Sequence, residues 1–173
     1  MLHQVCLKNV KMTNFSFKNL AEIKIEELRI SESTVLGLDI GDKTIGIATS
    51  DREIKIASGV TTIFRNRTER DFKLLKKSIE NYRIGLVILG WPLQMNGLAG
   101  SQCEKVLEFA QNLSSFIPGD LAKWDERFST KVVDNLMIQA DLSRRKRKKI
   151  VDQSAAVYLL QGALDFLNHS FVK

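Results

Sequence analysis

The sequence predicts a layered α/β domain, and three observations predict it. Two segments rich in Val, Ile and Thr, at 34–40 and 44–51, are separated by a tight turn, as in a β-hairpin. The run from Ile84 to Gly90 is continuously apolar; it is too short for a helix and typical of a strand buried in a parallel sheet. Helical periodicity is found at 68–82, before this apolar run, and again from 101 onward, after it, and a last helix is expected over 150–168. A hairpin with alternating helices and strands is the pattern of an α/β layered domain.

The individual elements follow from local signals. Gly41 and Asp42 form the hairpin connection, and Ser101 is expected to cap a helix with Glu104 at the capping-box position. Strands are expected at 34–40, 44–51, 56–63, 84–90 and 121–126. Helices are expected at 68–82, from 101 onward, at 129–142 and at 150–168.

Residues 1–33 are weakly patterned and are treated as an N-terminal extension to a single domain over 34–173. Their apolar side chains, among them Phe17, Leu20 and Ile23, can support a short helix or a strand packed on the domain. Met12 is an alternative start. The first residues lack the apolar stretch of a signal peptide, so secretion is not expected.

Composition limits the class of protein. With 173 residues, 44% hydrophobic and 27% charged, the chain can bury an ordinary core without disulfides or metal. The net charge of +6 favours a polyanionic partner, although proteins that bind no polyanion also reach this value. Cys6 and Cys103 form no metal-ligand pattern and no disulfide framework, and no apolar run is long enough to span a membrane. These features indicate a cytoplasmic protein without a membrane partner.

Asp39 lies within an apolar strand, where an uncompensated charge costs several kcal/mol. A cation, a metal or a dense set of hydrogen bonds usually compensates such a charge. One interpretation is structural, with the carboxylate held by backbone amides of the hairpin. The other is functional, with Asp39 as a ligand or catalytic group.

A second acidic site follows the strand expected at 121–126. Side chains alternate along a strand, so Asp125 and Glu126 point to opposite faces. Glu126 shares its face with Ala122 and Trp124, and this apolar company makes it the better companion for Asp39. Both acids can also be surface charges paired with Arg127.

The third acid is Asp152, at the start of the last expected helix. At 3.6 residues per turn it lies in line with Ala155, Ala156, Leu159 and Leu160, the stripe expected to face the core. An acid in a first helical turn is also favoured by the helix dipole, which does not require this face.

Six consecutive cations precede Asp152: Arg144, Arg145, Lys146, Arg147, Lys148 and Lys149. Such runs are often solvated loops, but this one leads into the helix that carries an acid. Together with Lys43 and Arg127, the run can hold a phosphate backbone, which provides affinity without reading sequence.

Three carboxylates at one end of a sheet repel one another unless they hold a cation. Oxygen ligands favour Mg²⁺ or Mn²⁺ over zinc. Two such ions can activate a water molecule and stabilise the leaving oxygen of a phosphodiester. The acidic residues therefore predict a two-metal site.

The ordered motifs resemble the YqgF (RuvX) family of Holliday-junction-resolvase-like proteins. The resemblance extends over about 34–168. Each short motif by itself is weak evidence, whereas the ordered set of motifs is specific. Its motifs are Gly37 through Ala48, Ser50-Asp51, Gly90-Trp91-Pro92-Leu93, Gly97 and Gly100, Asp125 through Thr130, Arg145-Lys146, and Asp152 through Ala156. Two features depart from the pattern: Trp91 stands where a smaller apolar residue is expected, and nothing in the family transfers to 1–33.

The resemblance implies a ribonuclease H-like fold with a mixed five-stranded sheet flanked by helices. It implies a metal-dependent cytoplasmic nuclease that acts on structured RNA, in 5′-end processing of pre-16S rRNA for ribosome biogenesis. By position, Asp39, Glu126 and Asp152 would be both the catalytic residues and the metal ligands. Branched DNA is the alternative substrate, and monomer and homodimer remain open.

Two other classes of function are compatible with parts of the sequence. Actin-like and sugar-kinase-like ATPases also open with an Asp-bearing strand and a glycine-bearing hairpin, but they normally need two lobes. A non-catalytic module could use the same fold to bind RNA or a protein, and its binding would survive loss of all three acids.

Overall fold

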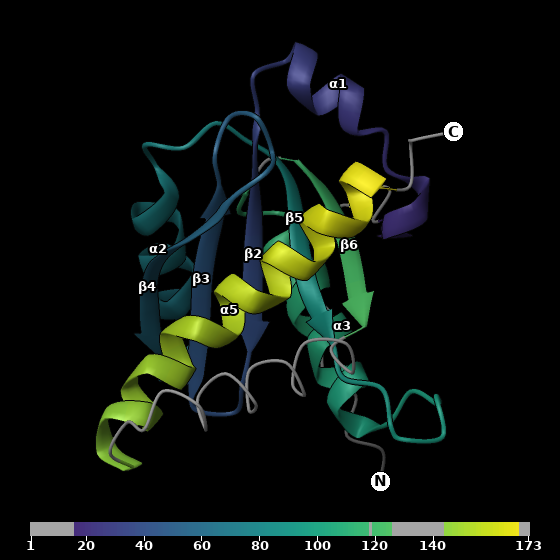
Figure 1. Ribbon diagram of the computed structural model, residues 1–173. Helices are drawn as coiled ribbons and strands as arrows, with labels where there is room; N and C mark the ends of the chain where they lie inside the picture. Colours follow the sequence, from purple (N-terminus) through teal and green to yellow (C-terminus); the bar gives the residue numbers. More distant parts are fainter. Residues whose placement is uncertain (1–15, 118, 126–143, 170–173) are drawn as a thin grey trace, which may run out of the picture.

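A computed structural model describes residues 16–117, 119–125 and 144–169, and for 144–154 it describes the backbone only. The described chain forms one mixed six-stranded sheet in the order β1-β6-β5-β2-β3-β4, with helices on both faces (Figure 1). Strands β1, β6, β5 and β2 run parallel; β3 pairs antiparallel with β2, and β4 pairs antiparallel with β3. The strands are β1 Phe17–Asn19, β2 Thr34–Ile40, β3 Thr44–Ser50, β4 Ala57–Phe64, β5 Ile84–Trp91 and β6 Asp120–Asp125.

The predicted α/β architecture is confirmed, and the strand boundaries agree to within about one residue. The helices are η1 Leu20–Glu22, α1 Ile25–Ile30, α2 Thr68–Ile79, α3 Ser101–Leu113 and α5 Arg144–His169. The helix expected at 129–142 lies outside the described residues. No helix within the described ranges is both long and apolar enough to cross a lipid bilayer.

Alternation along β2 separates two hydrophobic layers. Leu36 and Leu38 belong to a core covered by α2 and α3, whereas Val35 packs in a second core under α5. Figure 1 shows α5 crossing one face of the sheet, with α2 and α3 behind it. Because successive strand residues point to opposite faces, Gly37 and Asp39 lie on the face that α5 covers.

Gly37 allows α5 to cross β2 at close range. A Cβ atom at this position would lie 2.7 Å from Cβ of Leu160 and 3.4 Å from the carbonyl oxygen of Ala156. Both of these α5 residues are fully buried. The missing side chain therefore sets how closely the helix packs above the strand that carries Asp39.

The N-terminal segment joins the sheet, which corrects the predicted strand count from five to six. β1 pairs in parallel with β6, with Phe17 opposite Leu121. Three apolar residues after it are buried in the core beneath α5: Leu20, Ile23 and Ile25. A three-residue strand is too short to show a clear alternation, so the sequence left helix and strand equally open for this stretch.

Two helix starts differ from expectation. Gly100, with extended backbone, occupies the N-cap of α3, while Ser101 is the first helical residue and makes no capping side-chain hydrogen bond. α5 is helical from Arg144, so the cationic run belongs to the helix instead of preceding it. Arg and Lys are good helix formers, and a run of them carries no apolar period that would reveal the helix.

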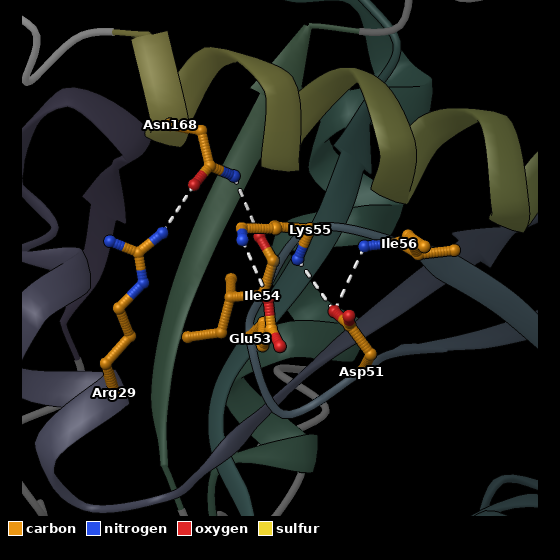
Figure 2. A network of polar contacts seen from close by, with 7 residues as sticks. All are labelled: Arg29, Asp51, Glu53, Ile54, Lys55, Ile56 and Asn168. Carbon is orange, nitrogen blue, oxygen red and sulfur yellow. Dashed lines mark hydrogen bonds and ion pairs between the residues drawn. The ribbon is translucent and has the colours of Figure 1, made fainter.

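The C-terminal half of α5 is fastened to the rest of the domain by polar contacts (Figure 2). Asn168 donates from Nδ2 to the carbonyl oxygen of Ile54 at 2.8 Å and accepts from Arg29 of α1 at 2.6 Å. Gln161 accepts from the backbone N–H of Ala57 and donates to the carbonyl of Lys55, both at 2.9 Å. The loop between β3 and β4 and helix α1 thus hold α5 in one register on the sheet.

Candidate active site

The candidate site lies at one edge of the sheet, where parallel strands end. β2, β5 and β6 run in the same direction, so their carboxyl ends meet at this edge (Figure 1). The β2–β3 hairpin turn, which includes Asp42 and Lys43, lies at the same edge. Ligands of open α/β sheets characteristically bind outside the carboxyl ends of strands.

Asp39 is the next-to-last residue of β2 and lies on the face covered by α5. It pairs across the sheet with Gly46 of β3. On the other side, Gly90 follows Leu89, which is the partner of Leu38. Asp39 is therefore bordered by a glycine on each of the two neighbouring strands.

The burial of Asp39 differs from the sequence interpretation. The residue is half-buried, and so are Ile40 and Gly41 after it, whereas the preceding strand residues are fully buried. The carboxylate therefore stands at the boundary between core and solvent, where the desolvation cost of a charge is smaller than within the strand. This position suits a group that must meet an incoming ion or substrate.

The described part of β6 follows the predicted alternation. Leu121 packs in the core beneath α2 and α3, whereas Ala122 and Trp124 pack on the side of α5. Trp124 contacts Phe166 of α5 with ring centroids 5.4 Å apart. These are the two residues with which the sequence grouped Glu126, but Glu126 itself lies outside the described residues.

Asp152 belongs to the described backbone of α5, four residues before the fully buried Ala156. Because α5 begins at or before Arg144, Asp152 is not in a first helical turn. The alternative explanation from the helix dipole therefore no longer applies, since that effect is confined to the first turn. Asp152 lies one helical turn before Ala156 and two before Leu160, the two α5 residues that pack against Gly37 of β2.

The predicted phosphate-binding residues are only partly described. Lys43 is exposed in the hairpin, and its carbonyl accepts from the backbone N–H of Arg65 at 2.9 Å. Arg65 also donates to the carbonyl of Gly41 at 2.7 Å, an arrangement that the sequence gave no reason to expect. The 144–149 run is described as helical backbone without side chains, and Arg127 lies outside the described residues.

Beside the hairpin, on the face of α2 and α3, lies a pocket of about 400 Å³. Asp42 lines it and forms an ion pair with Lys105 of α3, at 2.9 Å. The hydrogen bond and the positive charge from Lys105 lower the pKa of the exposed Asp42 carboxyl below its usual value. This pocket lies on the opposite side of the sheet from Asp39, so we do not assign the chemistry of Asp39 to it.

The described residues alone do not assemble a metal centre. Within 16–117, 119–125 and 155–169, no three His, Cys, Asp or Glu side chains come together as ligands. Of the three predicted acids, the structure therefore places the side chain of Asp39 alone. Its carboxylate is the kind of hard oxygen donor that Mg²⁺ and Mn²⁺ prefer.

The architecture places the chain in a known structural class. T. thermophilus RuvC, solved in complex with a Holliday junction substrate, superposes with a TM-score of 0.50 at 14% identity, covering 79% of this chain and 97% of that one. The fold is thus that of RuvC-like proteins, and the expected ribonuclease H-like architecture is confirmed.

Sequence similarity identifies the family. The model of the RuvX family, described as Holliday junction resolvase, matches residues 33–166, and the chain belongs to this family. A Clostridium novyi protein named "Putative pre-16S rRNA nuclease" is 49% identical over 131 residues, which cover 76% of this chain and 97% of that protein. A Clostridium kluyveri protein of the same name is 48% identical over 131 residues, with 76% and 96% coverage. The family assigned from the ordered motifs is therefore confirmed.

Proposed function

We propose that this protein is a metal-dependent nuclease that hydrolyses phosphodiester bonds in structured RNA, with the 5′ end of pre-16S rRNA as its physiological target. Membership of the RuvX family, with relatives at 48–49% identity named as nucleases of that RNA, carries the proposal. The position of Asp39 at the carboxyl ends of parallel strands supports it. The family match and the names of the relatives favour a nuclease over the ATPase alternative.

Asp39, Glu126 and Asp152 would hold one or two Mg²⁺ or Mn²⁺ ions and act as the catalytic acids. When bound, such ions polarise the phosphoryl group and lower the pKa of a coordinated water. Asp39 contributes a carboxylate on a strand within the sheet, a rigid support that fixes its position. Glu126 follows Trp124 by two residues, the spacing that returns a strand side chain to the same face.

The basic residues would position the substrate. Lys43 is exposed on the hairpin that follows Asp39, and its backbone is fixed by Arg65. The 144–149 run and Arg127 would neutralise further phosphates, and such contacts give affinity that falls as salt concentration rises. Lys43 stands closest in sequence to Asp39, so it is the cation expected to contact a phosphate near the scissile bond.

Branched DNA is the second candidate substrate. The description of the family as Holliday junction resolvase favours it, and the fold agrees with that of a resolvase. The two substrates share phosphodiester chemistry, so the same acids would serve either one. Parallel cleavage assays on precursor rRNA and on a four-way DNA junction, each with Mn²⁺ and with EDTA, distinguish them.

The test of the mechanism is Asp39→Asn, which keeps the size of the side chain and removes its charge. We expect metal-dependent cleavage to fall by at least about 100-fold, on the order of 2.7 kcal/mol in activation free energy. Thermal unfolding should change little, because Asp39 is half-buried at the end of its strand.

Asp42→Asn is the matched control, since this carboxylate lies three residues further on and pairs with Lys105 on the other face. Cleavage should survive in Asp42→Asn. Full activity in Asp39→Asn would refute the mechanism. Intact nucleic-acid binding without cleavage by the unmodified protein would instead establish the non-catalytic binding module.

A further inference from the structure

The loop between β5 and α3, residues 92–100, presents apolar side chains to solvent. Met95 is 90% exposed and Leu98 is 64% exposed. No residue between Ile84 and Cys103 carries a charge, so the loop cannot be explained as a solvated charged turn. Figure 1 shows this loop projecting beyond the body of the domain after the end of β5.

Internal hydrogen bonds give the loop a defined shape. Gly97 donates to the carbonyl of Gln94 at 2.8 Å, and Gln94 donates to the carbonyl of Leu98 at 3.0 Å. Gly97 has φ 82°, a conformation that glycine adopts easily, and Asn96 accepts from the N–H of Leu98 at 3.0 Å. Turn geometry therefore accounts for Asn96 and Gly97, but it requires no apolar residue at 95 or 98.

The base of the loop is packed as well. A Cβ atom at Gly100 would lie 2.7 Å from Nε2 of Gln94, so the start of α3 and the side chain of Gln94 fit closely. Met95 and Leu98 are consequently held outward on an ordered support. Their exposure results from the hydrogen-bonded turn and the packing beneath it.

The loop stands at the same edge of the sheet as Asp39. β2 and β5 are parallel neighbours, so the chain leaves Asp39 and enters this loop at adjacent strand ends. In Figure 1 the first turns of α5, with the cationic run, lie on one side of the end of β2, and the loop lies on the other. A substrate lying across this edge would pass from the cationic run of α5 to Asp39 and then to the uncharged, apolar tip of the 92–100 loop.

We propose that Met95 and Leu98 form a wedge that contacts unpaired or unstacked nucleobases of the substrate beside the cleavage site. A phosphate backbone calls for cations, and the loop has none, whereas the faces of nucleobases are apolar. Proteins that distort nucleic acids insert side chains such as Met and Leu between base steps. The wedge would select nucleic acid with a helical discontinuity over a continuous duplex, and this proposal rests on the proposed nuclease function.

The test measures binding in an Asp39→Asn background, which removes cleavage. The probes are an RNA stem with a two-nucleotide bulge containing 2-aminopurine and the same stem without the bulge. Met95→Ser with Leu98→Ser should weaken binding to the bulged stem about tenfold, which is about 1.4 kcal/mol, and should leave the paired stem unchanged. The double variant should also lose the change in 2-aminopurine fluorescence that binding produces.

The matched control is Ile30→Ser with Ile56→Ser, which replaces two apolar residues of similar exposure at the opposite edge of the sheet. This control should bind both stems as the parent does, and thermal unfolding verifies that each variant is folded. Equal weakening for both stems, or none for either, would overturn the wedge and point to a protein contact for the loop. If the parent itself binds neither stem, the proposed function fails together with the wedge. This outcome differs from one in which the parent binds and the substitutions in the loop have no effect, which overturns the wedge alone.

Discussion

Two glycine-to-alanine substitutions at the interface between α5 and the sheet should change stability in opposite directions. In Gly37→Ala the new Cβ would lie 2.7 Å from Cβ of Leu160, whereas carbon atoms in contact normally stay about 3.5–4.0 Å apart. The obstructing atom is attached directly to the helix backbone, so no side-chain rotation relieves the overlap. α5 must move outward by roughly 1 Å, a distance given by the difference from normal contact.

The magnitude follows from two opposing effects. Overpacking of a core typically costs about 1–3 kcal/mol, and replacing a strand glycine by alanine returns roughly 0.5–1 kcal/mol of chain entropy. The midpoints of these two ranges differ by about 1 kcal/mol, and we therefore expect Gly37→Ala to lower the free energy of unfolding by about that amount. Because the shifted helix carries Asp152, cleavage should fall further than the loss of folded protein explains.

Gly162→Ala is the matched control on the other side of the interface. Its new Cβ would lie 3.5 Å from Nε1 of Trp124, which is an ordinary contact. In a helix interior, alanine is more favourable than glycine by about 1 kcal/mol. This variant should be more stable than the parent. Guanidinium chloride unfolding followed by circular dichroism measures both changes, and an unchanged slope excludes altered compactness of the unfolded state. A Gly37→Ala variant as stable as the parent would refute the close packing of α5 on β2.

Two further predictions concern polar contacts. Asn168→Ala removes the hydrogen-bond partner of Arg29 and of the Ile54 carbonyl, and it should destabilise the fold by about 1–3 kcal/mol. Asn168→Asp should retain the contact with Arg29. Thermal unfolding of Asn168→Ala at the same temperature as the parent would contradict this prediction. Lys105→Ala should raise the pKa of Asp42 toward its usual value, as measured by NMR titration, because Lys105 lowers that pKa in the parent. A lowered carboxyl pKa stabilises the folded protein at pH values above the pKa of the unfolded state, and this stabilisation disappears as the pH falls through the pKa of the folded state. The Lys105→Ala variant lacks this contribution, so it should lose less stability than the parent when the pH is lowered. An unchanged titration midpoint for Asp42 would show that the ion pair does not form in solution.

The sequence predicted those parts of the fold whose pattern is local. The hairpin strands, β5 and the first residues of α2 were found because β-branched alternation, an apolar run and helical periodicity each identify one element. Alternation also predicted correctly that Ala122 and Trp124 share one face of the sheet. The face of Asp39 follows in the same way from Leu36 and Leu38, which bury against α2 and α3.

The remaining features depend on contacts between distant residues. The capping box at Ser101 and Glu104 satisfied a sequence rule, yet the loop that precedes it places Gly100 at the N-cap. The exposure of Met95 depends on the turn between Gln94 and Leu98, which composition alone does not reveal. Half-burial of Asp39 likewise reflects where the strand ends relative to α5, a matter of tertiary packing.

The N-terminal segment and Trp91 contact each other. The family match begins at residue 33, before which lies β1, and Trp91 stands where a smaller apolar residue was expected. Phe17 of β1 meets Trp91 edge to face, with ring centroids 5.6 Å apart, and the Lys123 ammonium lies 5.2 Å from the centroid of the Trp91 ring. β6 lies between β1 and β5 in the sheet, so the Phe17 ring reaches the Trp91 ring past this intervening strand. The contact between Phe17 and Trp91 thus joins the N-terminal segment to the strand end that leads into the proposed wedge loop.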